Sequence, residues 1–298
     1  MKFFSKAILG AACSALFAIG AAQAATVSSQ LYGGVNQLSD NSAESLIDMN
    51  VGAQSVAGRV DIGDRLRGIF TIETVEPLGG GSTRNLGGGS GNNELSGLFD
   101  ITVVGKLDLG AAAGAGRYQY VFAPTASFAA EIGGPAGTMV AFYEDTNAEY
   151  SRLAPTCTTT GFGGDCEANI KDGSLLWALG VNGGGDEFWT ASAFTDIIGL
   201  IGAASSSTAG GFFNVGLDLL LNNSTREFLG VDCGFPAAPT SLEFCGSGSL
   251  LGRSGAATPY DSFDNVDFTI NLVPEPSTIA LAGLALLGVA AASRRRKV

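Results

Sequence analysis

The stretch Gly68–Val75, GIFTIETV, gives the clearest indication of the fold class of this chain. Apolar and polar side chains alternate along it with a period close to two, and several of them are β-branched or aromatic. This pattern is typical of a β-strand with two different faces. Similar short runs, bounded by Gly, Asn, Asp, Ser or Pro, occur at Leu98–Leu107, Tyr118–Phe122, Met139–Phe142, Leu175–Val181, Glu187–Phe194, Phe212–Leu221 and Phe263–Leu272.

Helical signals are weak between these runs. The best helical candidates, Leu46–Val51 and Thr195–Ile201, are short. Many short strands separated by turn residues favour an all-β domain, either a sandwich or a jelly-roll-like fold. Residues 25–273, about 249 in number, are enough to bury a full core as a single domain.

The end of the chain has a different character. Pro274, Glu275 and Pro276 come first, and an apolar run of 15 residues follows from Thr278 to Ala292. This run is shorter than the ~20 residues of a comfortable transmembrane helix. A basic cluster then follows, which by the positive-inside rule would stay in the cytoplasm. Its members are Arg294, Arg295, Arg296 and Lys297.

Residues 274–298 resemble the PEP-CTERM sorting signal, because the Pro-Glu-Pro triplet, the hydrophobic helix and the basic tail occur in that order. The resemblance implies export, temporary retention in the inner membrane, and cleavage near Pro-Glu-Pro by an exosortase. It also implies delivery to the cell surface or the extracellular polysaccharide matrix. The competing interpretation is an ordinary C-terminal anchor helix.

The start of the chain predicts a secretory signal peptide over residues 1–24. Lys2 and Lys6 precede an apolar region at Ala7–Ala22, and Ala22 and Ala24 give the small-x-small pattern that signal peptidase recognises. A signal helix at one end and a sorting helix at the other therefore frame the β-rich domain.

The charge of residues 25–273 excludes one class of partner. They contain 10 Lys and Arg against 27 Asp and Glu, a formal charge of −17. Such a surface repels nucleic acids and anionic headgroups. We therefore expect no nucleic-acid partner, and extracellular polysaccharide is the partner that the sorting signal suggests.

Four cysteines remain after removal of the signal peptide. An even number in an exported chain indicates disulfides. Three connectivities exist, and we favour the two that close short loops. These pairs are Cys157–Cys166 and Cys233–Cys245, spaced nine and twelve residues apart.

The chain has no histidine, which excludes histidine-dependent catalysis and metal ligation. Carboxylate pairs for glycoside hydrolysis remain, with Glu144, Asp145 and Glu149 as candidates among many acids. Gly184–Phe188 spells GGDEF, the signature of diguanylate cyclases. An exported chain with few lysines does not suit that chemistry, so we interpret the segment as a hairpin turn between strands.

Non-catalytic binding is the other open class. Calcium would suit two groups of loop carboxylates, although neither has the spacing of a recognised calcium loop. Aromatic side chains can stack on sugars, but on strands they more often belong to the core. The carboxylates are Asp261, Asp264 and Asp267 near Asn265, and Asp61 with Asp64; the aromatics are Trp177, Trp189, Tyr118, Tyr120 and Tyr143. The sequence thus predicts an exported structural or adhesive protein that is not an enzyme, with no required cofactor. A polysaccharide hydrolase and a calcium-dependent carbohydrate-binding module are the alternatives.

Overall fold

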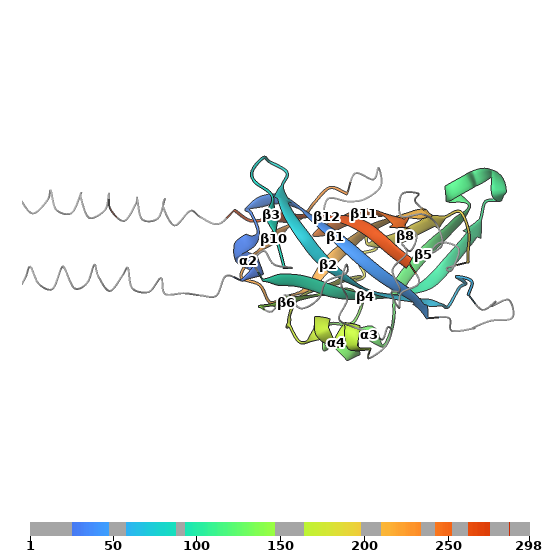
Figure 1. Cartoon of the computed structure of the whole chain (residues 1–298), viewed down its shortest axis with the longest axis horizontal. Helices are drawn as coiled ribbons and strands as arrows, with labels where there is room; N and C mark the ends of the chain where they lie inside the picture. Colours follow the sequence, from blue (N-terminus) through green and yellow to red (C-terminus); the bar gives the residue numbers. More distant parts are fainter. Residues whose placement is uncertain are drawn as a thin grey trace, which may run out of the picture.

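The computed structural model describes residues 26–47, 58–87, 93–146, 164–197, 210–233, 242–251 and 262–274, together with Leu286. These residues form a β-rich domain with a few short helices (Figure 1). The strands are β1 Gly34–Ile47, β2 Arg65–Pro77, β3 Arg84–Asn85, β4 Glu94–Asp108, β5 Tyr118–Pro124, β6 Thr138–Asp145, β7 Ser174–Gly180, β8 Phe188–Ala193, β9 Gly211–Asn222, β10 Phe228–Leu229, β11 Phe244–Leu251 and β12 Ser262–Leu272. The helices are α2 Val27–Gln30, the 3₁₀ segment η2 Ala111–Gly116, α3 Phe128–Ile132 and α4 Asp165–Lys171.

The strands close into a barrel, in the order β2-β1-β12-β11-β9-β7-β6-β4 and back to β2, with every pairing antiparallel. The all-β prediction is confirmed, whereas a sandwich of two sheets is not what the pairing forms. The sheet closes into a barrel because two strands that are distant in the sequence pair with each other. β1 and β12 come from opposite ends of the domain, and they pair from Gly34 opposite Leu272 onward. Closure of this kind removes the exposed edges of the main ring.

The two long strands β4 and β9 each pair with two shorter strands in succession, so the barrel has eight strands at both of its ends. β4 pairs with β6 over Glu94–Phe99 and with β5 over Ile101–Asp108. β9 pairs with β7 over Asp218–Asn222 and with β8 over Gly211–Gly216. β5 and β8 also pair with each other. They therefore fill the gap between β4 and β9 where β6 and β7 have ended.

Aromatic side chains fill the interior. Phe142 lies at the centre, with its ring 4.8 Å from that of Phe70 and 5.4 Å from that of Trp177, measured between centroids. Gly97 makes room for this cluster, since a Cβ there would lie 2.2 Å from Phe70 Cζ. Side-chain filling is expected for a small barrel. The interior therefore acts as the core of the domain.

A second layer covers the outside of the barrel over β2, β4 and β6, where α3 and α4 pack (Figure 1). Below the helices lies Arg67, which is 1% exposed. Its guanidinium donates hydrogen bonds to Asp100, Glu131 and Glu167. Burial by itself raises the pKa of Glu131, but hydrogen bonds and charge from Arg67 and Lys171 outweigh it, so this pKa lies below its ordinary value. This network joins the two helices to the barrel.

Two local predictions are wrong in the described residues. Leu46 and Ile47 belong to strand β1, because their backbone pairs with β2, and Thr195–Ile197 is not helical. Residues 48–51 and 198–201 lie outside the described residues. The GGDEF segment is not a hairpin turn either. β7 and β8 lie end to end along β9 and do not pair with each other.

Within the described ranges, no helix is long and apolar enough to cross a membrane. The predicted signal helix over residues 1–24 lies outside these ranges. So does the predicted sorting helix over residues 278–292, apart from Leu286.

Candidate functional site

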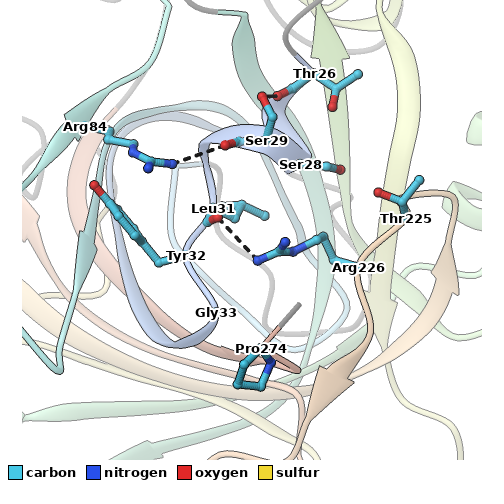
Figure 2. Close-up of a pocket in the computed structure, with 10 residues that line it drawn as sticks. All are labelled: Thr26, Ser28, Ser29, Leu31, Tyr32, Gly33, Arg84, Thr225, Arg226 and Pro274. Carbon is cyan, nitrogen blue, oxygen red and sulfur yellow. Dashed lines mark hydrogen bonds between the residues drawn. The ribbon is translucent and has the colours of Figure 1, made fainter. Parts of the chain in front are cut away.

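A pocket of about 570 Å³ lies where both ends of the barrel chain meet (Figure 2). We call it the terminal pocket. Thr26 and Pro274, the first and last residues of the described domain, both line it. Its remaining lining residues are Ser28, Ser29, Leu31, Tyr32, Gly33, Arg84, Thr225 and Arg226. Thr26 follows the predicted signal-peptidase position closely in the sequence, and Pro274 begins the predicted Pro-Glu-Pro triplet, so the two described residues next to these positions lie at the same end of the barrel.

The N-terminal segment is anchored at this end by burial. Val27, in α2, is fully buried, and Leu31 is 4% exposed; both belong to the main core. The backbone N–H of Val27 donates to the carboxylate of Glu144, which also accepts a 2.8 Å hydrogen bond from Asn93. Glu144, a candidate catalytic carboxylate from the sequence, thus holds the beginning of the domain in place.

Two arginines hold the backbone of the same segment. Figure 2 shows Arg84 and Arg226 reaching it from opposite sides. Arg84 donates to the carbonyl of Gln30 at 2.7 Å, and its guanidinium stacks over the ring of Tyr32 at 3.9 Å. Arg226 is only 7% exposed and donates to the carbonyl of Leu31 at 3.3 Å. Carbonyls at the end of a short helix lack helical partners, and these cations supply donors to them.

The C-terminal exit is fixed from the other side. The N–H of Val273 donates to the carbonyl of Glu227 at 2.9 Å, one residue before Pro274. Pro274 packs against Gly33, where a Cβ would lie 2.8 Å from Pro274 Cα. The chain therefore reaches the predicted Pro-Glu-Pro triplet in a defined position.

All the predicted processing residues except Pro274 lie outside the described residues. Only Pro274 is placed; the others are Ala22, Ala24, Glu275, Pro276, Arg294, Arg295 and Arg296. Among the cysteines, the structure contains the Cys233–Cys245 disulfide, with a Cα–Cα distance of 5.3 Å. Cys166 is also disulfide-bonded and fully buried, and Cys157 lies outside the described residues.

The aromatic residues considered for sugar binding belong to the core. Trp177 is fully buried, and the others are at most 8% exposed: Trp189, Tyr118, Tyr120 and Tyr143. The core interpretation of these side chains is therefore confirmed.

The Asp61 and Asp64 pair has a structural role. Asp61 accepts a 2.7 Å hydrogen bond from Lys106 Nζ, and Asp64 accepts one of the same length from the N–H of Asp61. Lys106 also donates to Asp196 at 2.9 Å. Burial lowers the pKa of Lys106, but the two carboxylates outweigh it and raise this pKa above its ordinary value. Asp61 and Asp196 therefore neutralise Lys106, and Asp64 holds the backbone of Asp61.

Sequence reasoning missed one acidic cluster. Asp186, Glu187 and Asp218 bring carboxylate oxygens within 4.8 Å of one another, a spacing that suits a metal ion. Asp218 lies on β9 where pairing passes from β8 to β7. Burial, followed by the charges of Glu243 and Glu187, raises the pKa of Asp218 to about 7. Glu187 already accepts N–H bonds from Asn182 and Gly185, so part of this cluster stabilises the loop.

Together these observations define the class of protein: a closed β-barrel with an aromatic core, whose two ends leave from one pole beside one pocket. Residues 272–297 match the model of the PEP-CTERM protein-sorting motif. This confirms the resemblance drawn from the Pro-Glu-Pro triplet and the basic tail. The motif implies an exported protein that an exosortase processes, and it is consistent with association with the cell envelope. No curated protein and no solved structure matches the chain.

Proposed function

We propose that this protein is a non-catalytic structural or adhesive component of the envelope or the extracellular polysaccharide matrix. The observation that carries the proposal is the position of the two chain ends. Because Thr26 and Pro274 both line the terminal pocket, a chain anchored through its C-terminal motif would be held from this pole of the barrel. Cleavage there would release a complete domain whose sides and opposite pole are free to contact the matrix.

The packing of the barrel interior argues against a substrate site within the aromatic core. A cavity between Phe70, Phe99, Trp189 and Phe213 measures about 10 Å³, which is about the space of one water molecule. Substrate pockets are usually hundreds of Å³. The barrel interior at this position is therefore core.

The experiment compares matrix cohesion in producing cells with and without this protein. We expect the deletion strain to form a weaker matrix, measured as retained biomass under calibrated shear. The full chain should restore cohesion, whereas a chain ending at Val273, without the sorting motif, should not. Unchanged cohesion after deletion would contradict the proposal.

An assay with purified protein tests the enzymatic alternative. Purified protein incubated with isolated matrix polysaccharide should release no new reducing ends. Their release in proportion to protein concentration would identify a hydrolase instead, and variants of Asp218 and Glu187 would then show whether the acidic cluster of Asp186, Glu187 and Asp218 is responsible.

A further inference from the structure

The outer face of β9, β11 and β12 carries an open groove of about 450 Å³. β11 and β12 lie side by side in the barrel wall (Figure 1). β9 is the next strand after β11. We call the outward side chains of this groove the outer strip. Its members are Phe212, Asn214, Ser247, Ser249, Asn265 and Asp267.

The pairing register aligns these residues in two rows across the strands. Ser247 on β11 lies opposite Asn214 on one side and Asp267 on the other. Ser249 lies opposite Phe212 and Asn265 in the same way. Paired positions on one face of a sheet are about 5 Å apart, so each row forms a short ladder of side chains.

β11 forms the floor of the groove because its residues there are small. Serines face outward on β11, and Gly246 and Gly248 face inward. A Cβ on Gly248 would lie 2.4 Å from the carbonyl oxygen of Asn265 and 2.7 Å from the ring of Phe213. Glycine therefore lets β11 lie close to its neighbours, while the longer side chains of β9 and β12 form the walls.

The polar groups of the outer strip are available for a ligand. Among the described residues, none of its serine, asparagine and aspartate side chains has a hydrogen-bond or ion-pair partner. Phe212 is 47% exposed and has no ring contact within the same residues. An exposed ring beside amides, hydroxyls and one carboxylate offers an apolar surface together with directional donors and acceptors.

The charge of the outer strip limits the ligand further. Asp267 is its only charged residue, in a domain of formal charge −17. An anionic polymer would be repelled by the domain as a whole, and a cationic one has only this one carboxylate to meet in the groove. A neutral polyhydroxylated chain matches both its hydrogen-bonding groups and its charge.

We propose that the outer strip binds a neutral polysaccharide chain, with Phe212 stacking on a sugar ring. The asparagine amides donate hydrogen bonds to its hydroxyls and accept them, and the carboxylate of Asp267 accepts them. This inference rests on the proposed role in the matrix, because it names the matrix component that the protein contacts. It assigns adhesion to one face of the barrel.

The test uses the processed protein and neutral polysaccharide from the matrix of the producing cells, collected as the fraction that an anion-exchange column does not retain. Binding is measured by isothermal titration calorimetry. We expect Phe212→Ala to weaken binding about tenfold, as for a buried aromatic anchor in an interface. The matched control is Leu107→Ala, which truncates an apolar side chain that is 53% exposed on β4, outside the groove. Thermal melts verify that both variants fold.

A second pair of variants tests the polar ladder. Asp267→Asn should weaken binding to the neutral fraction without creating affinity for the retained anionic fraction. The control is Glu76→Gln, an exposed residue on β2, which should leave binding unchanged. No binding by the wild type, or equal binding by the wild type and Phe212→Ala, would overturn the proposal. A dimer in sedimentation that Phe212→Ala dissociates would also overturn it, because the strip would then contact a second copy of this chain. If binding fails but the protein still restores matrix cohesion, only the outer strip is wrong and the proposed function stands.

Discussion

Gly33 and Pro274 are in contact although 240 positions separate them in the sequence, and the contact leaves no room for a side chain on Gly33. Pro274 is the first residue of the Pro-Glu-Pro triplet. The N-terminal segment of the domain therefore sets the position at which the sorting motif leaves the barrel.

Replacing Gly33 by alanine should displace Pro274, because the new Cβ would lie 2.8 Å from its Cα. We expect a loss of about 1–3 kcal/mol in the free energy of unfolding, typical of overpacking, together with slower removal of the sorting motif. Urea unfolding and a pulse-chase of the precursor measure the two effects. Gly79→Ala is the matched control, since nothing lies within 4 Å of a Cβ at that position. Equal stability and equal processing rates of the two variants would contradict the inference that Gly33 sets the position of Pro274.

Arg67→Met should be strongly destabilising. It leaves the carboxylates of Asp100, Glu131 and Glu167 without their shared cation beneath α3 and α4. Breaking a buried ion network of this kind typically costs about 3–5 kcal/mol. The measurement is the urea midpoint. Arg117→Met removes the surface pair with Asp108 and should shift the midpoint little. A small effect at Arg67 would mean that the helices are held by their apolar contacts alone.

Much of the fold is readable in the sequence because strand patterns are local. GIFTIETV lies within β2, and the predicted runs at Leu98–Leu107 and Phe212–Leu221 lie within β4 and β9. β11 was missed because FCGSGSLL lacks the expected bulk, and its small residues are explained only by the neighbours they contact. Closure depends on β1 meeting β12, a pairing of distant segments that no local pattern reports.

The sites were harder to predict than the strands. The sorting motif is contiguous and was recognised, whereas the terminal pocket joins four separate segments. The outer strip had one readable signal. Phe212 and Phe213 are adjacent on a strand, so only one of them can face the core. The structure shows that Phe213 is buried and Phe212 is exposed.

Stability should depend on pH through Asp218. Its pKa is about 7 in the folded protein and near 4 in an unfolded chain, so the folded state binds more protons between these values. The stability contributed by this group is complete below pH ~4 and is lost as the pH rises through about 7. Asp218→Asn should therefore raise the stability at pH 8 by about 1–2 kcal/mol and have little effect at pH 4. Thermal melts at the two pH values measure this. Asp267→Asn on the open face is the control, and an equal gain at both pH values would show that burial of charge is not the cause.

The Cys233–Cys245 disulfide should stabilise the domain modestly, because it closes a loop of only twelve residues. The double variant to serine should lose about 3 kcal/mol or less. A melt with and without reductant checks the value. If the serine variant and the wild type respond equally to reductant, the stabilisation comes from another cysteine pair.

We infer that an exosortase processes this exported barrel at the pole where Thr26 and Pro274 both lie. Intact-mass spectrometry of protein recovered separately from cells and from the extracellular matrix tests it most directly. We expect a matrix form that begins near Ala25, ends near Pro274 and is lighter by four hydrogens than the fully reduced chain. A matrix form that retains Arg294–Lys297, or the absence of any form shortened at the C-terminus, would contradict it.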